Sequence, residues 1–250
     1  MENNGYLIVA SNKPNFYIMA INLAWSIRDY HPDAKICIVT EQRFEDHRLK
    51  EVADDVLYCD NHYRAKLWGM ANSPYDKTFY IDADCMVVHE DISTVFDHLK
   101  DNDMLFTYLG DDRTYVFREV GFPAGRMGYC GGVCLYDSSK PIVMEFMKDW
   151  WELFYKQYSN QWWPKNEDGG WDEKNYPRSL KQWDQFTLWW LTEKEDKYKD
   201  LKIDIFEHDA RWNWYTCYDE SRTQCGGPIV IEHYSCHANK DSAIYNVEPK

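Results

Sequence analysis

The sequence predicts a single α/β domain with a mostly parallel central sheet flanked by helices. Through residue 108, short apolar runs alternate with segments whose apolar residues recur at helical spacing, the pattern of strands connected by helices. The length of 250 residues fits one domain, and 44% hydrophobic residues are enough to bury a sizeable core. No internal repeat or low-complexity linker divides the chain. We therefore expect one folded unit rather than a disordered chain.

Nearly continuous apolar runs predict the strands of the first half. Residues 5–10 (GYLIVA) form such a run, typical of a parallel strand buried on both faces. Later strands are expected at 34–40, 56–58, 77–81 and 104–108. Apolar residues at helical spacing from Phe16 to Ile27 predict the first helix, which follows a turn ending at Pro14 and stops at His31-Pro32. Further helices are expected at 44–53, 65–71 and 92–99.

The second half of the chain is less regular. It opens with a long connection at 110–129 that carries Gly and Arg, and connections of this length are usually functional. An aromatic, acidic loop is expected at 161–177. The remaining elements are expected to be helices at 141–158 and 183–193 and strands at 132–136, 203–206 and 229–231.

Composition and charge exclude several classes of protein. With 28 Lys+Arg against 42 Asp+Glu, the net charge of −14 argues against general nucleic-acid binding, which needs basic surface. No window approaches the ~18 consecutive apolar residues of a membrane span. The polar start at residues 1–5 lacks the features of a signal peptide, and none of the eight cysteines forms a CxxC pair. We therefore expect reduced cysteines and a cytoplasmic protein.

Two carboxylates stand directly after a predicted buried strand. Asp82 and Asp84 lie between the apolar runs KTFYI and CMVV. In an extended chain their side chains point the same way, so both could reach one Mg²⁺ or Mn²⁺ ion. The alternative is a solvated acidic loop, as at the similar segments 101–103 and 111–112. The apolar flanks favour a metal site, because two buried like charges are costly without compensation.

This segment and four others resemble, in order, the signature of GT-A glycosyltransferases, above all glycosyltransferase family eight, which includes glycogenin. Lys66-Leu67 precedes the segment 75–84 at the family's spacing. Gly131-Gly132-Val133 resembles the family's Asn-Ser-Gly-Val strand start, and Trp183-Asp184-Gln185 resembles its Asp-Gln helix start. The segment 231–234 (IEHY) resembles its late His-Phe/Tyr motif. The resemblance spans residues 5 to about 240.

The resemblance implies a Rossmann-like GT-A domain with a nucleotide-binding half at about 1–108 and a half for the donor sugar and acceptor at about 109–250. It implies that Mn²⁺ or Mg²⁺ is bound by Asp82, Asp84 and His233. Asp184 would face the reacting sugar, with Gln185 beside it. The residues implied to bind the nucleotide or donor are Val9, Ala10, Ser11, Lys66, Ala83, Gly131, Gly132 and Lys240. Among the cations, Lys66 is the first choice for the diphosphate, followed by Lys240 and Arg126.

The sequence departs from the family pattern in three places. Cys130 stands where the family usually has Asn, next to the donor sugar. The late motif lacks the family's Gly, Pro and Trp, and its Lys240 comes one position late. The connection at 110–129 is long for the family, so we expect specialised acceptor recognition.

Structural roles compete with these assignments. Asp184 could only cap its helix, since Asp is favoured at a helix start. His233 could be an ordinary strand-end histidine, and His237 lies four residues later as another candidate ligand. Most tryptophans are expected to pack in the core. Trp171 and Trp214, which lie beside polar loop residues, are the better candidates for a platform on which an acceptor sugar stacks.

Three functions remain. The first is a metal-dependent glycosyltransferase that transfers a sugar from a nucleotide diphosphate sugar, expected to be UDP-hexose, to a glycan or other hydroxyl acceptor, with retention. The second is a sugar-nucleotide nucleotidyltransferase, disfavoured because SNKPN after the first strand is not Gly-rich and basic. The third is a non-catalytic carbohydrate-binding protein, which would not need the ordered motifs. Association into a homodimer stays open.

Overall fold

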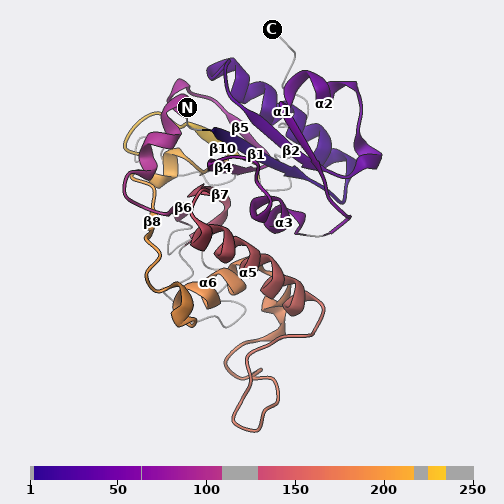
Figure 1. The fold of residues 1–250 in the computed structure, drawn as a ribbon, viewed down its shortest axis with the longest axis vertical. Coiled ribbons are helices and arrows are strands. Elements are labelled where there is room, and N and C mark those ends of the chain that lie inside the picture. The colour runs from indigo at the N-terminus through magenta and orange to yellow at the C-terminus, as the bar shows by residue number, and fades with distance from the viewer. Residues whose placement is uncertain (1–2, 63, 109–128, 217–224, 235–250) are drawn as a thin grey trace.

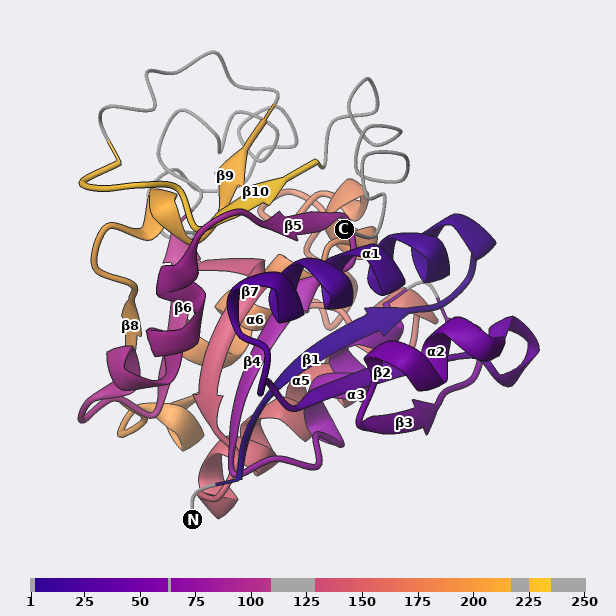
Figure 2. The same ribbon diagram turned by 90° about the horizontal axis from the view of Figure 1, so that it is seen from above.

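The computed structural model describes residues 3–62, 64–108, 129–216 and 225–234. A seven-stranded sheet in the order β3-β2-β1-β4-β7-β6-β8 forms its centre (Figures 1 and 2). Its strands are β1 (Asn4–Ala10), β2 (Ile36–Thr40), β3 (Asp55–Tyr58), β4 (Lys77–Asp82), β6 (Met104–Tyr108), β7 (Tyr129–Asp137) and β8 (Ile203–Ile205). Strand β7 runs antiparallel to β4 and β6, and the other neighbouring strands are parallel. The predicted mostly parallel sheet is confirmed.

Helices cover both faces of this sheet (Figure 2). They are α1 (Pro14–Tyr30), α2 (His47–Val52), α3 (Ala65–Ala71), α5 (Pro141–Tyr158) and α6 (Asp184–Glu193). Along β1, Tyr6 and Ile8 face the α1 side, whereas Leu7 and Val9 face α3 and α5. This alternation explains why the strand is apolar throughout, because neighbouring residues enter opposite cores. None of the described helices combines the length and apolarity that a membrane span requires.

A second, three-stranded sheet lies beside the carboxyl end of β4. It consists of β5 (Cys85–Val87), β10 (Ile231–His233) and β9 (Trp214–Tyr215), with β10 in the middle. Strand β5 follows β4 after two residues, and His233 pairs with Cys85. The backbone N–H of Tyr234 donates to the carbonyl of Asp84 at 2.8 Å. This pairing brings the late motif of the chain to the DxD segment.

The structure differs from the prediction in a few elements. The helix expected at 92–99 is a 3₁₀ helix that begins two residues earlier, Glu90–Leu99. Hydroxyl groups of Ser93 and Thr94 donate to carbonyls three residues earlier, a competing bond that suits the tighter turn. The strand expected at 229–231 is Ile231–His233, and β5 and β9 were not expected. Of the long connection expected at 110–129, all but the last residue lies outside the described residues.

The aromatic loop expected at 161–177 projects from the body of the molecule between α5 and α6 (Figure 1). Lys165 and Trp171 form an isolated antiparallel bridge across it. At its base, four buried residues form a separate core cluster: Trp163, Leu180, Phe186 and Trp189. Most of the loop's tryptophans therefore pack, as the composition suggested.

Gly69 lets α3 lie close to the sheet. A Cβ at this position would lie 2.6 Å from Cγ2 of Val9 and 3.3 Å from Cγ2 of Val39. We expect Gly69→Ala to destabilise the protein by about 1 kcal/mol, because overpacking (~1–3 kcal/mol) outweighs the helix propensity gained (~1 kcal/mol). Urea denaturation measures the difference. Gly170→Ala is the control, since its nearest neighbour would lie at 3.5 Å. A more stable Gly69→Ala would contradict this packing.

Candidate functional site

A cavity of about 250 Å³ opens at the carboxyl ends of β1 and β4. Ligands of open α/β sheets bind at this edge. Its lining residues are Val9, Ser11, Asn12, Lys13, Phe16, His62, Arg64, Ala65, Lys66, Tyr80, Asp82, Ala83 and Asp84. Val9, Ser11, Lys66 and Ala83 were expected here together with the two aspartates. Asn12, Lys13, Phe16, His62, Arg64 and Tyr80 were not identified from the sequence.

The other residues predicted to bind the nucleotide or donor sugar lie near this cavity or outside the described residues. Ala10 is fully buried and faces the α1 core, although it neighbours lining residues. Gly131 and Gly132 lie in β7, beside the carboxylates of Asp184 and Asp82. Lys240, with the alternatives Arg126 and His237, lies outside the described residues.

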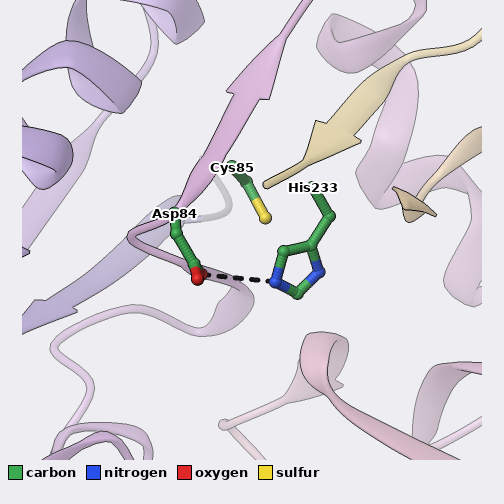
Figure 3. Close-up of side chains that lie close together, drawn as sticks. All are labelled: Asp84, Cys85 and His233. Atoms are coloured by element: carbon green, nitrogen blue, oxygen red, sulfur yellow. Dashed lines mark ion pairs between the residues drawn. The ribbon is translucent and has the colours of Figure 1, made fainter. Parts of the chain in front are cut away.

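Asp84 and His233 meet at the junction of the two sheets. His233 Nε2 lies 3.2 Å from Asp84 Oδ1, and Figure 3 shows the two side chains pointing toward each other. Together with Cys85, their potential ligand atoms lie within 4.8 Å of one another. His233 is 4% exposed, and its ring stacks on Tyr215 with the centroids 4.6 Å apart. The imidazole is therefore held by packing on one side while Nε2 faces the carboxylate.

Asp82 approaches the same place from β4. A Cβ added to Gly132 would lie 2.9 Å from Asp82 Oδ2 and 3.1 Å from His233 Cε1. The missing side chain of Gly132 therefore leaves a space between carboxylate and imidazole. The hydroxyl of Tyr80 donates to the other oxygen, Oδ1, of Asp82, which orients the carboxylate.

The side-chain atoms that surround this space suit a hard divalent cation as ligands. Asp82, Asp84 and His233 offer carboxylate oxygens and an imidazole nitrogen, the ligand types of Mg²⁺ and Mn²⁺ sites. The nearby Cys85 offers a soft sulfur atom, whereas hard cations such as Mg²⁺ and Mn²⁺ prefer oxygen ligands. The residues present thus fit the metal that the resemblance implies.

Asn213 is a partner of His233 that the sequence did not reveal. His233 Nδ1 lies 2.7 Å from Oδ1 of Asn213, so a protonated Nδ1 donates to this amide. The Asn213 Nδ2 donates to Thr107 Oγ1 at 2.9 Å and to Cys130 Sγ at 3.4 Å. Both ends of the amide are thereby engaged. Asn213 lies in an irregular segment before β9, where no periodic pattern marks a functional residue.

A buried ion-pair network forms the other wall. Lys66 Nζ donates to the carbonyl of Gly131 at 3.0 Å and lies 3.2 Å from Asp184 Oδ2 and 3.5 Å from Asp82 Oδ1. Arg64 Nε lies 3.2 Å from Asp184 Oδ1. Burial favours neutral groups, but the opposite charges outweigh it. The pKa of Asp184 is therefore lowered, and that of Lys66 is raised by Asp184 and Asp82.

No protein-family model matches the sequence, and no match is found among curated proteins. Solved structures do match. The galactosyltransferase LgtC, in complex with donor and acceptor sugar analogs, aligns with a TM-score of 0.59 and 14% identity over 98% of both chains. The glycosyltransferase GlyE of Streptococcus pneumoniae TIGR4 aligns with a TM-score of 0.58 and 16% identity over 94% of this chain and 55% of the GlyE chain. The bifunctional glycosyltransferase WbbM aligns with a TM-score of 0.58 and 12% identity over 98% of this chain and 50% of the WbbM chain.

This chain has the GT-A glycosyltransferase fold. Its near-complete overlap with LgtC agrees with one domain built on the central sheet. Within the GT-A fold, the DxD segment of this chain lies at the end of β4 and Asp184 at the start of α6.

Asp184 does not cap α6, so that interpretation is wrong. The N-cap residue is Trp183, and no side chain makes a capping hydrogen bond. Asp184 is instead fully buried, and its two carboxylate oxygens lie 3.2 Å from Arg64 Nε and Lys66 Nζ. Gln185 is half-buried, and its buried Oε1 lacks a hydrogen-bond partner in the described part of the chain. The unfilled hydrogen-bond capacity of this buried oxygen points to a polar ligand.

The two tryptophans predicted as an acceptor platform have different surroundings. Trp214 is 4% exposed and packs with Cys225 and Ile229, which argues against a platform there. Trp171 is partly exposed, but the guanidinium of Arg178 lies 4.1 Å from its ring centroid and Trp163 packs nearby. One face of Trp171 is therefore already covered by a cation.

The buried pairs of Asp184 predict a loss of stability on neutralisation. We expect Asp184→Asn to lower the free energy of unfolding by about 3 kcal/mol, the lower end of the range for a broken buried ion pair. The loss is limited because Lys66 Nζ would still contact the carbonyl of Gly131 and the carboxylate of Asp82. Since folding lowers the pKa of Asp184, its contribution is complete above the unfolded value of ~3.9 and lost as pH falls through the folded value. The difference from wild type should thus shrink below about pH 4.

Urea denaturation between pH 3 and 8 measures this difference, with the exposed Asp200→Asn as control. Equal stability of Asp184→Asn and wild type at pH 7 would contradict the buried pairing.

Proposed function

We propose that this chain is a glycosyltransferase that moves a hexose from UDP-hexose to a hydroxyl group of an acceptor such as a glycan. In this proposal it uses Mn²⁺ or Mg²⁺ and retains the anomeric configuration. The observation that carries the proposal is the convergence of Asp82, Asp84 and His233 with the buried Lys66–Asp184 pair beside one cavity. The GT-A fold supports it, since the matched structures include galactosyl- and xylosyltransferases.

The nucleotide would occupy the cavity at the ends of β1 and β4. All of its lining residues lie between positions 9 and 84, which agrees with a nucleotide-binding half at about 1–108. Lys13 and Arg64 give this cavity positive charge in a chain of net charge −14. The anionic diphosphate would lie where these cations and the DxD carboxylates converge. The half from 109 to 250 would supply the donor-sugar and acceptor contacts.

The cation, held by Asp82, Asp84 and His233, would supply Lewis-acid stabilisation of the leaving diphosphate. Lys66 would keep Asp184 ionised and in place through their 3.2 Å contact. It would also add positive charge next to Asp82, where the phosphate charge develops. Lys66 would thus both position Asp184 and stabilise the negative charge of the phosphate.

Asp184 and Gln185 would face the donor sugar. The buried Oε1 of Gln185 has no hydrogen-bond partner among the described residues, which suits a sugar hydroxyl, and Asp184 lies directly before it. One matched structure is an active-site variant of LgtC in which a glutamine is replaced by glutamate, so that enzyme has a glutamine in its active site. Gln185, which follows Asp184 at the start of α6, is our candidate for the same position.

Metal-dependent binding of UDP tests the proposal. Calorimetry should show UDP binding with Mn²⁺ and much weaker binding with a chelator, because Asp82 and Asp84 repel a diphosphate unless a cation bridges them. Asp84→Asn should fold normally, since the amide keeps the shape, but should lose metal-dependent binding and turnover across a panel of nucleotide sugars.

Asp101→Asn is the matched control, because it alters the exposed first aspartate of the DxD-like segment at 101–103. Equally strong UDP binding in chelator, or unchanged donor hydrolysis by Asp84→Asn, would remove the metal assignment and the proposed mechanism with it.

The hydrogen bond between Asn213 and His233 predicts a separate effect on metal affinity. Removing the partner of a metal-binding imidazole typically costs about 10–100-fold in metal affinity. We therefore expect Asn213→Ala to weaken Mn²⁺ binding by roughly tenfold or more, measured by titration calorimetry with UDP present. Asn213→Asp should retain most of the affinity, because a carboxylate also accepts the Nδ1–H of His233. If both variants bind Mn²⁺ like wild type, Asn213 does not orient the imidazole.

A further inference from the structure

A second cavity, of about 370 Å³, lies next to the one at the ends of β1 and β4. His62 and Ala65 line both cavities, so the segment before α3 and its first turn separate them. The other lining residues come from the end of β3, from the segment 59–61 that follows it, from α3 and from α5. None of the roles considered above uses this space.

Aromatic rings form the walls of the second cavity. Trp68 comes from α3, Trp151 and Tyr155 come from α5, and Tyr58 ends β3. Tyr58 and Tyr155 are 45% and 47% exposed, although most large apolar side chains of the described residues are buried. The ring of His62 lies edge-on to Trp151, with the centroids 4.9 Å apart. Because α3 packs against α5, these rings are held in place while parts of them stay open to solvent.

The charge of this cavity differs from that of its neighbour. Its described lining contains no Lys or Arg, whereas Lys13, Arg64 and Lys66 line the first cavity. Its polar side chains are chiefly Asp60 and Asn61, both exposed. A phosphate or another anion would therefore meet a carboxylate without a compensating cation. A neutral ligand with hydroxyl groups fits better, because Asp60 accepts hydrogen bonds and Asn61 both donates and accepts them.

We propose that this aromatic cavity binds a neutral oligosaccharide, as a glycan site separate from the site of transfer. Pockets for organic ligands combine apolar walls with a few polar groups that fix orientation. The rings of Trp68, Trp151 and Tyr155 would contact the apolar C–H faces of the sugars. Asp60 and Asn61 would bind their hydroxyl groups. A glycan bound here would be separated from the cavity at the ends of β1 and β4 by His62 and Ala65, which line both cavities.

Binding to an array of neutral and acidic glycans, without nucleotide and with a chelator, tests this proposal. We expect neutral glycans to bind, with affinities then measured by calorimetry. Tyr155→Ser and Asp60→Asn should each weaken binding about three- to tenfold, the range for losing one ring or polar contact. Both positions are exposed, so the fold should persist. Tyr30→Ser, at a 40% exposed tyrosine on α1, is the matched control and should bind like wild type.

Three results would overturn the proposal. One is the absence of binding to any neutral glycan, or binding to acidic glycans alone. Another is wild-type affinity of Tyr155→Ser and Asp60→Asn. The third is competition: if UDP with Mn²⁺ displaces the glycan, the cavity belongs to the nucleotide site. Because the assay needs neither donor nor metal, its outcome is independent of the proposed transfer reaction.

Discussion

The buried ammonium group of Lys66 is the interaction on which the site depends. Its side chain is 10% exposed, and an ion in such a place costs several kcal/mol unless oxygen ligands replace water. Asp184, Asp82 and the carbonyl of Gly131 supply those oxygens. They belong to α6, β4 and β7, so one charge on α3 fixes how four elements meet. The order β1-β4-β7 in the sheet is what places Gly131 beside Asp82.

Two adjacent glycines in β7 complete this arrangement by leaving room. A Cβ on Gly131 would lie 3.3 Å from Asp184 Oδ2, and one on Gly132 would lie 2.9 Å from Asp82 Oδ2. Neither glycine has a left-handed backbone, so their function here is close approach rather than an unusual conformation. Successive residues of a strand face opposite sides, so Gly131 makes space on the side of Asp184 and Gly132 on the side of Asp82 and His233.

Much of the fold was predictable because its signals are periodic. Strands buried on both faces appear as continuous apolar runs, and residues 5–10 and 77–81 show this plainly. The DxD segment stood out because it breaks such a run. The contacts that complete the site correspond to no periodic pattern in the sequence. Arg64 reaches Asp184 from before a short helix, and Asn213 reaches His233 from an irregular segment, so only the folded chain brings them together.

The departure at Cys130 is explained by the same contacts. Where the resembling family usually has Asn, this chain has a buried thiol that accepts a hydrogen bond from Asn213 and lies 3.2 Å from the hydroxyl of Tyr215. An amide is still present next to this position, but it comes from the segment before β9. If His233 Nε2 binds a cation, its Nδ1 must carry the proton and donate to Asn213 Oδ1. The amide then has its Nδ2 toward Thr107 and Cys130, which both must accept, as the distances allow. Cation binding at one nitrogen thus sets the direction of hydrogen bonds as far as β6 and β7.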